Sequence, residues 1–307
     1  MLYRSLIFLF CFTAVLSPLY AAPPRAEQAR TDHYRFQLGD YQVTALLDGV
    51  SSREPASIAL QPQEVSNHLK RHRIEKTTAA SNNAFLIHTG SRLILVDTGN
   101  KGGKVVESLI ASGYHPEQVD TILLTHFHPD HVSGLLDDGA LAFPNADVLC
   151  DRRESDYWLS EEQEMKAPEA LKARFAQIQE VFKPVQEAGK LAPFEPSSRL
   201  FPGIEAVPAP GHTPGHTAYL VESGNKGLLF WGDTVHIQQA QFAAPELTVK
   251  YDSDTEAAVK SRRALLEMAD RQALLIASPH ISFPGLGHVI KEGSGYRWIP
   301  VPYGTDF

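Results

Sequence analysis

Beyond residue 33, short apolar or alternating runs are separated by glycine turns, the pattern of β-strands. Such runs occupy residues 34–38, 41–47, 85–89, 92–96 and 119–124. Gly39-Asp40 separates the first pair and Gly90-Ser91 separates the second, which predicts two β-hairpins. The run at 119–124 is almost wholly apolar, which is typical of a strand buried on both faces.

Helical periodicity appears between these runs and after them. Residues 104–112 place their apolar side chains on one helical face and end at Gly113. Residues 151–182 form a longer amphipathic stretch, which Pro184 and the proline- and glycine-rich segment 189–203 interrupt. Further strands are predicted at 217–221, 228–231 and 273–277, and a helix at 254–269. Hairpins followed by alternating strands and helices predict an α/β fold in which helices cover sheet layers.

The first 22 residues have the order of a secretory signal peptide. Arg4 precedes the apolar run 6–16, and the small pair Ala21-Ala22 follows. The run is short for a membrane span, and no later stretch is long and apolar enough for one, so no stable membrane insertion is expected after cleavage. We expect an exported protein, periplasmic or secreted, with a flexible lead-in at 23–33 and one domain at 34–307.

Composition narrows the classes of partner. The 307 residues carry a formal net charge of −8 and no lysine- or arginine-rich tract, which argues against a nucleic-acid partner. Cleavage would leave Cys150 as the only cysteine, so no intramolecular disulfide can form, and we expect Cys150 to be a small buried apolar residue.

The segment Thr-His-Phe-His-Pro-Asp-His at 125–131 follows directly on the predicted strand 119–124. In an extended segment His126 and His128 point the same way, and Pro129 keeps this pair extended. A helix predicted at 132–136 would place Asp130 and His131 at its N-terminal end. Three imidazoles and a carboxylate on one loop are ligands that suit zinc and similar metals.

This segment resembles the His-x-His-x-Asp-His signature of the metallo-β-lactamase superfamily. Asp97-Thr98-Gly99, Pro210 to His216 and Gly232-Asp233-Thr234 resemble its other motifs in the expected order. The segments 232–237, 242–249 and 279–288 are similar to the branch that holds methyl parathion hydrolase and its lactone- and aryl-ester-cleaving relatives. The resemblance runs from about Asp48 to the C-terminus and implies an αββα sandwich with a helical insertion or lid at 150–200.

The resemblance also implies a dinuclear metal centre. One metal would be held by His126, His128 and His212, and the other by Asp130, His131 and His280. Asp233 would bridge both metals, and Asp130 and Asp233 would be the catalytic carboxylates. Zn2+ is the expected divalent ion at both positions, with Mn2+, Co2+ and iron as alternatives.

Other polar residues of these motifs are assigned supporting roles. Asp97 is either an orienting group beside a ligand or a turn cap. His216 is interpreted as a packed or hydrogen-bonded neighbour rather than a ligand, and His288 as structural.

The substrate pocket is predicted less directly. Related hydrolases line an apolar leaving-group site with aromatic residues of the insertion, which points to Trp158 and Phe175, although both could simply pack the insertion onto the sheet. His236 lies three residues after Asp233, where similar acyl-homoserine lactone lactonases often have a tyrosine.

We therefore expect the protein to hydrolyse small-molecule lactones or aryl esters with a hydroxide shared between the metals. The sequence leaves a homodimer open. An organophosphate triester hydrolase is the alternative. A β-lactamase is disfavoured because similar β-lactamases place cysteine or serine where this chain has Asp233. A glyoxalase-type thioesterase, a nuclease and a non-catalytic metal-binding module are the remaining alternatives.

Overall fold

The computed structural model describes residues 32–302. The predicted signal peptide at 1–22 and all but the end of the predicted lead-in lie outside the described residues. His33, at the end of that lead-in, already belongs to the first strand. Among the described residues no helix combines the length and the apolar character needed to cross a membrane.

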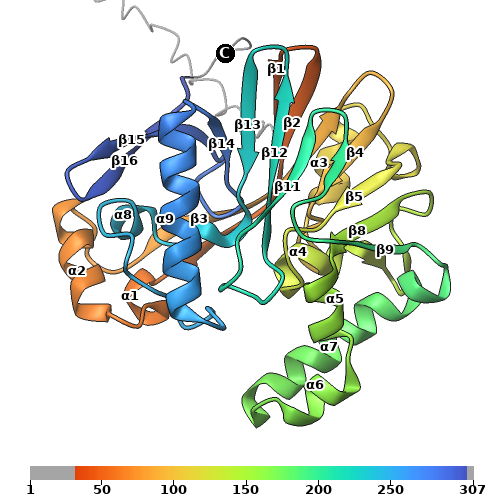
Figure 1. Cartoon of the computed structure of the whole chain (residues 1–307), viewed down its shortest axis with the longest axis horizontal. Helices are drawn as coiled ribbons and strands as arrows, with labels where there is room; N and C mark the ends of the chain where they lie inside the picture. The colour runs from red at the N-terminus through yellow and green to blue at the C-terminus, as the bar shows by residue number, and fades with distance from the viewer. Residues whose placement is uncertain (1–31, 303–307) are drawn as a thin grey trace, which may run out of the picture. The chain divides into compact units, whose positions relative to one another are not determined.

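Two seven-stranded sheets form the centre of the domain (Figure 1). The first sheet consists, in spatial order, of β1 (His33–Leu38), β2 (Tyr41–Arg53), β3 (Thr78–His88), β4 (Leu93–Val96), β5 (Thr121–Leu123), β8 (Asp147–Asp151) and β9 (Leu191–Phe194). The second consists of β10 (Arg199–Phe201), β11 (Ile204–Pro208), β12 (Thr217–Ser223), β13 (Lys226–Phe230), β14 (Leu275–Ala277), β15 (Leu286–Glu292) and β16 (Gly295–Pro300). A separate small ribbon pairs β6 (Leu136–Asp137) with β7 (Ala140–Leu141).

Both predicted hairpins are present. Tyr41 pairs with Leu38 across the turn at Gly39, which has a positive φ of 57°. His88 pairs with Leu93 in the second hairpin. From β4 onward the first sheet is parallel, so the ends of β4, β5 and β8 lie at the same edge.

Helices lie around the two sheets. They are α1 (Pro55–Ile58), α2 (Pro62–Arg71), α3 (Val105–Ala111), α4 (Pro129–Val132), α5 (Arg152–Trp158), α6 (Glu161–Lys166), α7 (Glu169–Glu187), α8 (Gln238–Gln241) and α9 (Thr255–Arg271), with short 3-10 turns at Pro116–Gln118, Ser133–Leu135 and Gly232–Thr234. In Figure 1, α3, α5 and α7 lie on the side of the first sheet and α9 on the side of the second. The layers therefore form the predicted αββα sandwich.

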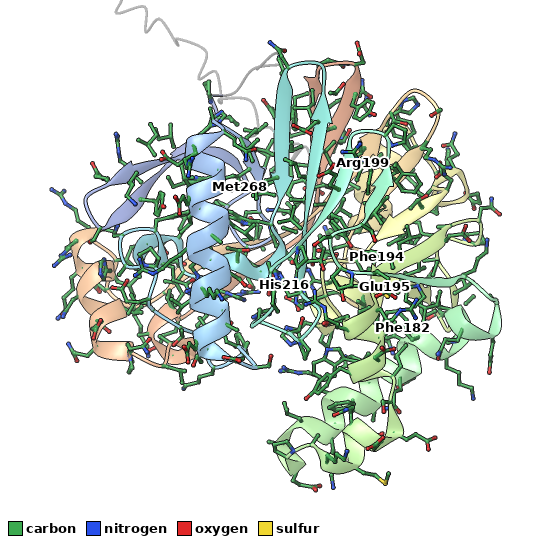
Figure 2. The ribbon with its side chains drawn as sticks, viewed as in Figure 1. Phe182, Phe194, Glu195, Arg199, His216 and Met268 are labelled. Atoms are coloured by element: carbon green, nitrogen blue, oxygen red, sulfur yellow. The ribbon has the colours of Figure 1, made fainter. Side chains whose placement is uncertain are left out.

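Alternation along the strands divides the core into layers. Val43, Phe85 and Ile94 meet Tyr219 and Phe230 in the layer between the two sheets. Their neighbours Leu46, Leu86 and Leu95 point to the other face and pack under α3 and α7, where Phe182 is fully buried (Figure 2). Leu265 and Leu266 of α9 pack on the outer face of the second sheet.

Two helix boundaries differ from the prediction. The turn after the histidine motif is helical from Pro129, earlier than residues 132–136, because proline fits the first position of a helix. It passes into a 3-10 turn at Ser133–Leu135, and Leu136 is already extended. Helix α7 continues past Pro184 to Glu187, since Val181, Phe182 and Val185 remain buried along the same face and this burial outweighs the hydrogen bond that proline lacks.

The predicted insertion at 150–200 contains α5, α6 and α7. In Figure 1, α6 and the start of α7 project away from the sheets. The end of this region is not helical, because β9 and β10 form the edges of the first and second sheets.

Candidate metal centre

All seven predicted ligands lie together at one edge of the sandwich. The 126–131 loop follows β5, His212 follows β11, Asp233 follows β13 and His280 follows β14. The side chains form two neighbouring groups, each compact enough to hold one metal ion: His126, His128, His212 and Asp233 in the first, and Asp130, His131 and His280 in the second.

Asp233 lies between the two groups and faces each with a different oxygen. Its Oδ2 lies 3.1 Å from Nε2 of His212 and 3.6 Å from Nε2 of His126. Its Oδ1 lies 3.1 Å from Nε2 of His131 and 3.1 Å from Nε2 of His280. This is the arrangement that a carboxylate shared by two metal ions requires.

The donor atoms fit divalent metals. Nε2 of His126, Nε2 of His131 and Oδ1 of Asp233 are buried and have no hydrogen-bond partner. Buried polar atoms are rarely left unpaired unless a ligand satisfies them. Imidazole nitrogen and carboxylate oxygen are the donors that zinc and similar ions take. The residues therefore fit two divalent ions.

Protonation in this cluster follows burial and charge. Burial and the neighbouring imidazoles lower the pKa of His126 and His128 well below the usual range, which leaves their lone pairs free. Burial also lowers the pKa of His212, but hydrogen bonds to Asp233 and Asp252 outweigh it and raise that pKa to about 9. Asp233 is buried, yet His280 and His131 bring its pKa well below normal. The carboxylates thus create a field that favours cations at this site.

Two of the ligand rings, those of His131 and His212, are oriented through their other nitrogen by a carboxylate. Nδ1 of His131 lies 2.8 Å from Oδ2 of Asp97. The same oxygen accepts a hydrogen bond from the Thr125 hydroxyl, and Oδ1 of Asp97 accepts one from the Thr125 backbone. Nδ1 of His212 lies 2.9 Å from Oδ1 of Asp252. Partners of this kind fix the tautomer and raise the basicity of a ligating imidazole. Asp97 thus takes the orienting position that was one of its two predicted roles.

His216 and His288 are positioned as structural residues. Nδ1 of His216 lies 2.9 Å from the Ala209 carbonyl, and its Nε2 accepts a hydrogen bond from the Asp233 backbone. Burial lowers the pKa of His216 to about 3, in keeping with a neutral acceptor. Nδ1 of His288 lies 3.0 Å from the Leu274 carbonyl, away from the metal groups.

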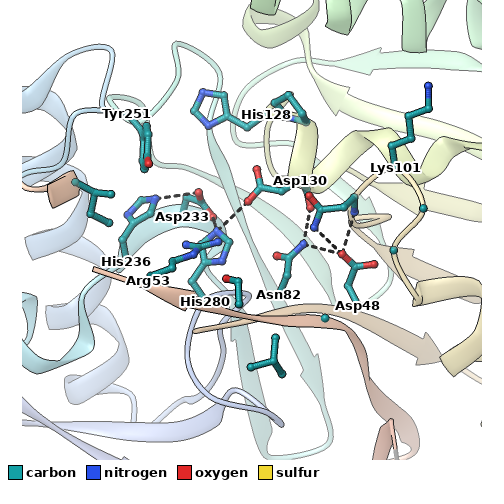
Figure 3. A pocket seen from close by; sticks show the side chains of 18 of the residues that line it. Asp48, Arg53, Asn82, Lys101, His128, Asp130, Asp233, His236, Tyr251 and His280 are labelled. Carbon is teal, nitrogen blue, oxygen red and sulfur yellow. Dashed lines mark hydrogen bonds and ion pairs between the residues drawn. The ribbon is translucent and has the colours of Figure 1, made fainter. Parts of the chain in front are cut away.

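Above the metal groups lies a cavity of about 730 Å³ (Figure 3). His128, Asp130, Asp233, His236 and His280 form its base. The walls come from the end of β2 and the end of α1, from the 100–103 loop, and from single residues of β3, α7 and the segment after α8. They include Asp48, Val50, Arg53, Ile58, Asn82, Lys101, Arg174 and Tyr251.

The predicted pocket residues divide into two kinds. His236 lines the cavity, and its Nε2 lies 3.0 Å from Oδ2 of Asp233, close enough to join a metal group as well. Trp158 and Phe175 do not line the cavity, so their prediction as pocket residues was wrong: they are 2% and 0% exposed, and their tilted rings pack against each other in the outer core. Their ring area is more favourably buried under the first sheet than left exposed in an open cavity.

Trp158 instead donates a hydrogen bond to Glu154, a residue that the sequence did not mark as part of the site. Glu154 is buried, and its Oε1 accepts hydrogen bonds from Nε1 of Trp158 and from the Phe127 backbone, both at 2.9 Å. Its Oε2 accepts from the Gly215 backbone at 2.7 Å. Glu154 thus joins the 126–131 loop to the loop that carries His212.

Other residues around the site were also missed. Arg262 is 1% exposed, donates to the Thr234 carbonyl and lies 4.0 Å from Oδ2 of Asp252, behind His212. Asn82 donates to Asp48 and to the Asp130 carbonyl. No local motif marks these residues, because their partners lie far away in sequence.

The fold and the paired metal groups define a metal-dependent hydrolase, and the comparisons give its family. The chain belongs to the metallo-beta-lactamase superfamily, whose family model matches residues 77–280. The crystal structure of the hydrolase AbOPH, in the beta lactamase superfamily, is similar to this chain, with 36% sequence identity and a TM-score of 0.85. The match covers 90% of this chain and 100% of that chain.

Lactonases are among the similar proteins. AidC, a dizinc quorum-quenching lactonase solved with a product, is 28% identical with a TM-score of 0.82, over 89% of this chain and 98% of that chain. The N-acyl homoserine lactonase of Bacillus cereus is 26% identical over 197 residues, which are 64% of this chain and 66% of the lactonase. The chain is thus a metallo-hydrolase with lactonase relatives.

Proposed function

We propose that this chain hydrolyses the ester bond of lactones and aryl esters, and that lactones are its preferred substrates. The observation that carries the proposal is the position of Asp233, whose two oxygens face two metal-binding groups at the base of a cavity. Two divalent ions held there would polarise a substrate carbonyl and lower the pKa of water. The lactonase AidC, similar over most of both chains, supports the substrate class.

The residues of the chain have distinct tasks in this reaction. Asp233 would be shared by the two metal ions, because its two oxygens face the two ligand groups. The Asp130 side chain is 30% exposed, against 4% for Asp233, so Asp130 is the ligand carboxylate that opens to the cavity. It is placed to accept a proton from water and to pass it to the leaving oxygen, as a general base and acid.

His236 has a positioning role next to Asp233. Burial lowers the pKa of His236, so the ring is neutral. A neutral imidazole that lies 3.0 Å from a carboxylate oxygen must donate its proton to it, which fixes the proton on Nε2. His236 therefore orients the bridging carboxylate while its ring forms part of the cavity base.

The cavity walls favour lactones over aryl esters. With Trp158 and Phe175 buried elsewhere, Tyr251 is the only aromatic ring besides histidine among the residues that line the cavity in the described part of the chain. An aryl leaving group gains most from stacking on aromatic rings, which these walls offer only at Tyr251. A compact lactone needs less apolar contact, because its carbonyl and ring oxygens are recognised by the metal groups.

The test is a hydrolysis panel with the metal-loaded protein, covering an aliphatic lactone, an aryl ester, paraoxon and a cephalosporin. We expect kcat/KM to fall in that order, with the cephalosporin near background. The variant Asp233→Ala serves as the negative control for contaminating esterases. A tenfold or greater preference for paraoxon, or no turnover of any lactone, would refute the proposal.

A further inference from the structure

Three cationic side chains from separate elements line the cavity. Arg53 stands at the end of β2, Lys101 in the loop between β4 and α3, and Arg174 on α7. Figure 3 shows Arg53 on the same side as His236, and Lys101 on the other side, beyond Asp48. Within residues 32–302 the side chains of Arg53 and Lys101 have no hydrogen-bond or ion-pair partner.

Two carboxylates of the cavity wall have other partners. Glu54 pairs with Lys76 at 3.4 Å. Asp48 is buried and accepts hydrogen bonds from Asn82, from the Asn100 backbone and side chain, and from the Lys104 backbone. These bonds hold the loop that carries Lys101 in place and engage both oxygens of Asp48. Among the described residues, neither carboxylate forms an ion pair with Arg53, Lys101 or Arg174.

The Arg174 side chain has one hydrogen-bond contact among the described residues, and it is to the metal-ligand candidate His128. Its Nη1 lies 3.2 Å from Nε2 of His128, and His128 faces the metal group with Nδ1, which lies 2.9 Å from Nε2 of His212. Arginine only donates, so the contact requires a lone pair on Nε2 and a proton on Nδ1. If Nδ1 gave its lone pair to a metal, the proton would have to sit on Nε2, and two donors would then face each other. Arg174 would be free to bind another group in the metal-loaded protein.

We propose that the substrate of this hydrolase carries an anionic oxyacid group, a carboxylate or a phosphate, in addition to the ester bond that is cleaved. Arg53, Lys101 and Arg174 are the cationic side chains of the cavity wall that this group would meet; the proposal rests on the proposed ester hydrolysis. Guanidinium groups match the two oxygens of a carboxylate or phosphate in a bidentate geometry. Two divalent ions more than offset Asp130 and Asp233, so the loaded cavity is cationic although the chain carries a net charge of −8.

The experiment compares three lactones that differ in one substituent: a carboxylate, a phosphate, or a neutral carboxamide of similar size. We expect kcat/KM for the better anionic lactone to exceed that of the carboxamide by about tenfold or more, the size of one charge-assisted hydrogen bond. This ratio should fall towards one in Arg174→Gln and Arg53→Gln. Lys183→Gln, which also removes a cation from α7 but at a position 74% exposed, is the matched control and should keep the wild-type ratio.

The outcomes separate the two proposals. Turnover of the neutral lactone with an anion ratio of one or less overturns the anion site and leaves ester hydrolysis intact. A ratio that stays at the wild-type value in both arginine variants also overturns it. If no lactone is hydrolysed, the proposed function fails, and the anion site is then tested by calorimetric titration of glutarate and inorganic phosphate into the metal-loaded protein. Weaker binding in the arginine variants than in Lys183→Gln supports the anion site. Equal binding refutes it. The larger of the two anion ratios identifies the group.

Discussion

Replacing Glu154 by alanine tests whether this buried carboxylate holds the two metal-binding loops together. The change removes the acceptor of three buried donors: the Phe127 and Gly215 backbones and Nε1 of Trp158. Unsatisfied buried donors cost about 1–3 kcal/mol each, so the gross loss is about 3–9 kcal/mol. Burial raises the pKa of Glu154, because a buried carboxylate charge is unfavourable. Removing that charge offsets part of the gross loss, and we expect the free energy of unfolding to fall by about 3 kcal/mol in total.

The assay is thermal unfolding of the metal-loaded protein, followed by metal analysis. A loss of about 3 kcal/mol lowers the Tm of a domain of this size by about 6–12 °C. Metal affinity should fall by about 10–100-fold, as for other residues that orient ligands. Glu154→Gln keeps one acceptor oxygen and should lie between wild type and Glu154→Ala. Asp156→Ala, an exposed position on the same helix, is the control. A Tm within 2 °C of this control and an unchanged metal content would refute the role of Glu154.

The remaining predictions concern the metals and the corrected pocket. Elemental analysis of wild type should approach two metals per chain, and a stable maximum of one with full activity would contradict the dinuclear site. Asp233→Ala should lower the metal content and reduce kcat by about 10²-fold or more even in excess metal, whereas Cys150→Ala should keep the wild-type metal content and kcat. Equal losses of kcat in the two variants would exclude Asp233 from the mechanism. Trp158→Phe should lower Tm without changing the ratio of kcat/KM between aromatic and aliphatic lactones, and a selective loss for aromatic lactones would restore Trp158 to the pocket. Chelation should lower Tm as well as activity, with both recovered on adding Zn2+; an unchanged Tm would show that the ligand cluster is stable without metal.

The sequence predicted best what short segments encode. Residues 126–131 lie in one loop, so their ligand types and spacing are visible without a fold. His212, Asp233 and His280 were found because each lies in a motif similar to those of the superfamily. The hairpins were predicted because the turn at Gly39 and the alternation beside it are local as well.

The sequence could not predict contacts between distant segments. Glu154 accepts a hydrogen bond from Gly215, and Asp252 meets His212; in neither pair does a local pattern mark the partner. Trp158 and Phe175 illustrate the same limit: an aromatic residue on an amphipathic helix suits a pocket or a core equally well, and only the packing of α7 decides. The strand at 191–194 was missed because Pro193 and its surroundings match a loop, although proline is tolerated at a sheet edge.

The distribution of the ligands over both sheets has a consequence for how the protein acquires its metals. The 126–131 loop extends from the first sheet, whereas His212, Asp233 and His280 extend from the second. Neither sheet alone offers both complete groups, so the centre exists only once the two sheets have docked. Both metal groups are then completed only at a late stage of folding, and the ions available at that stage decide which metals the folded protein contains.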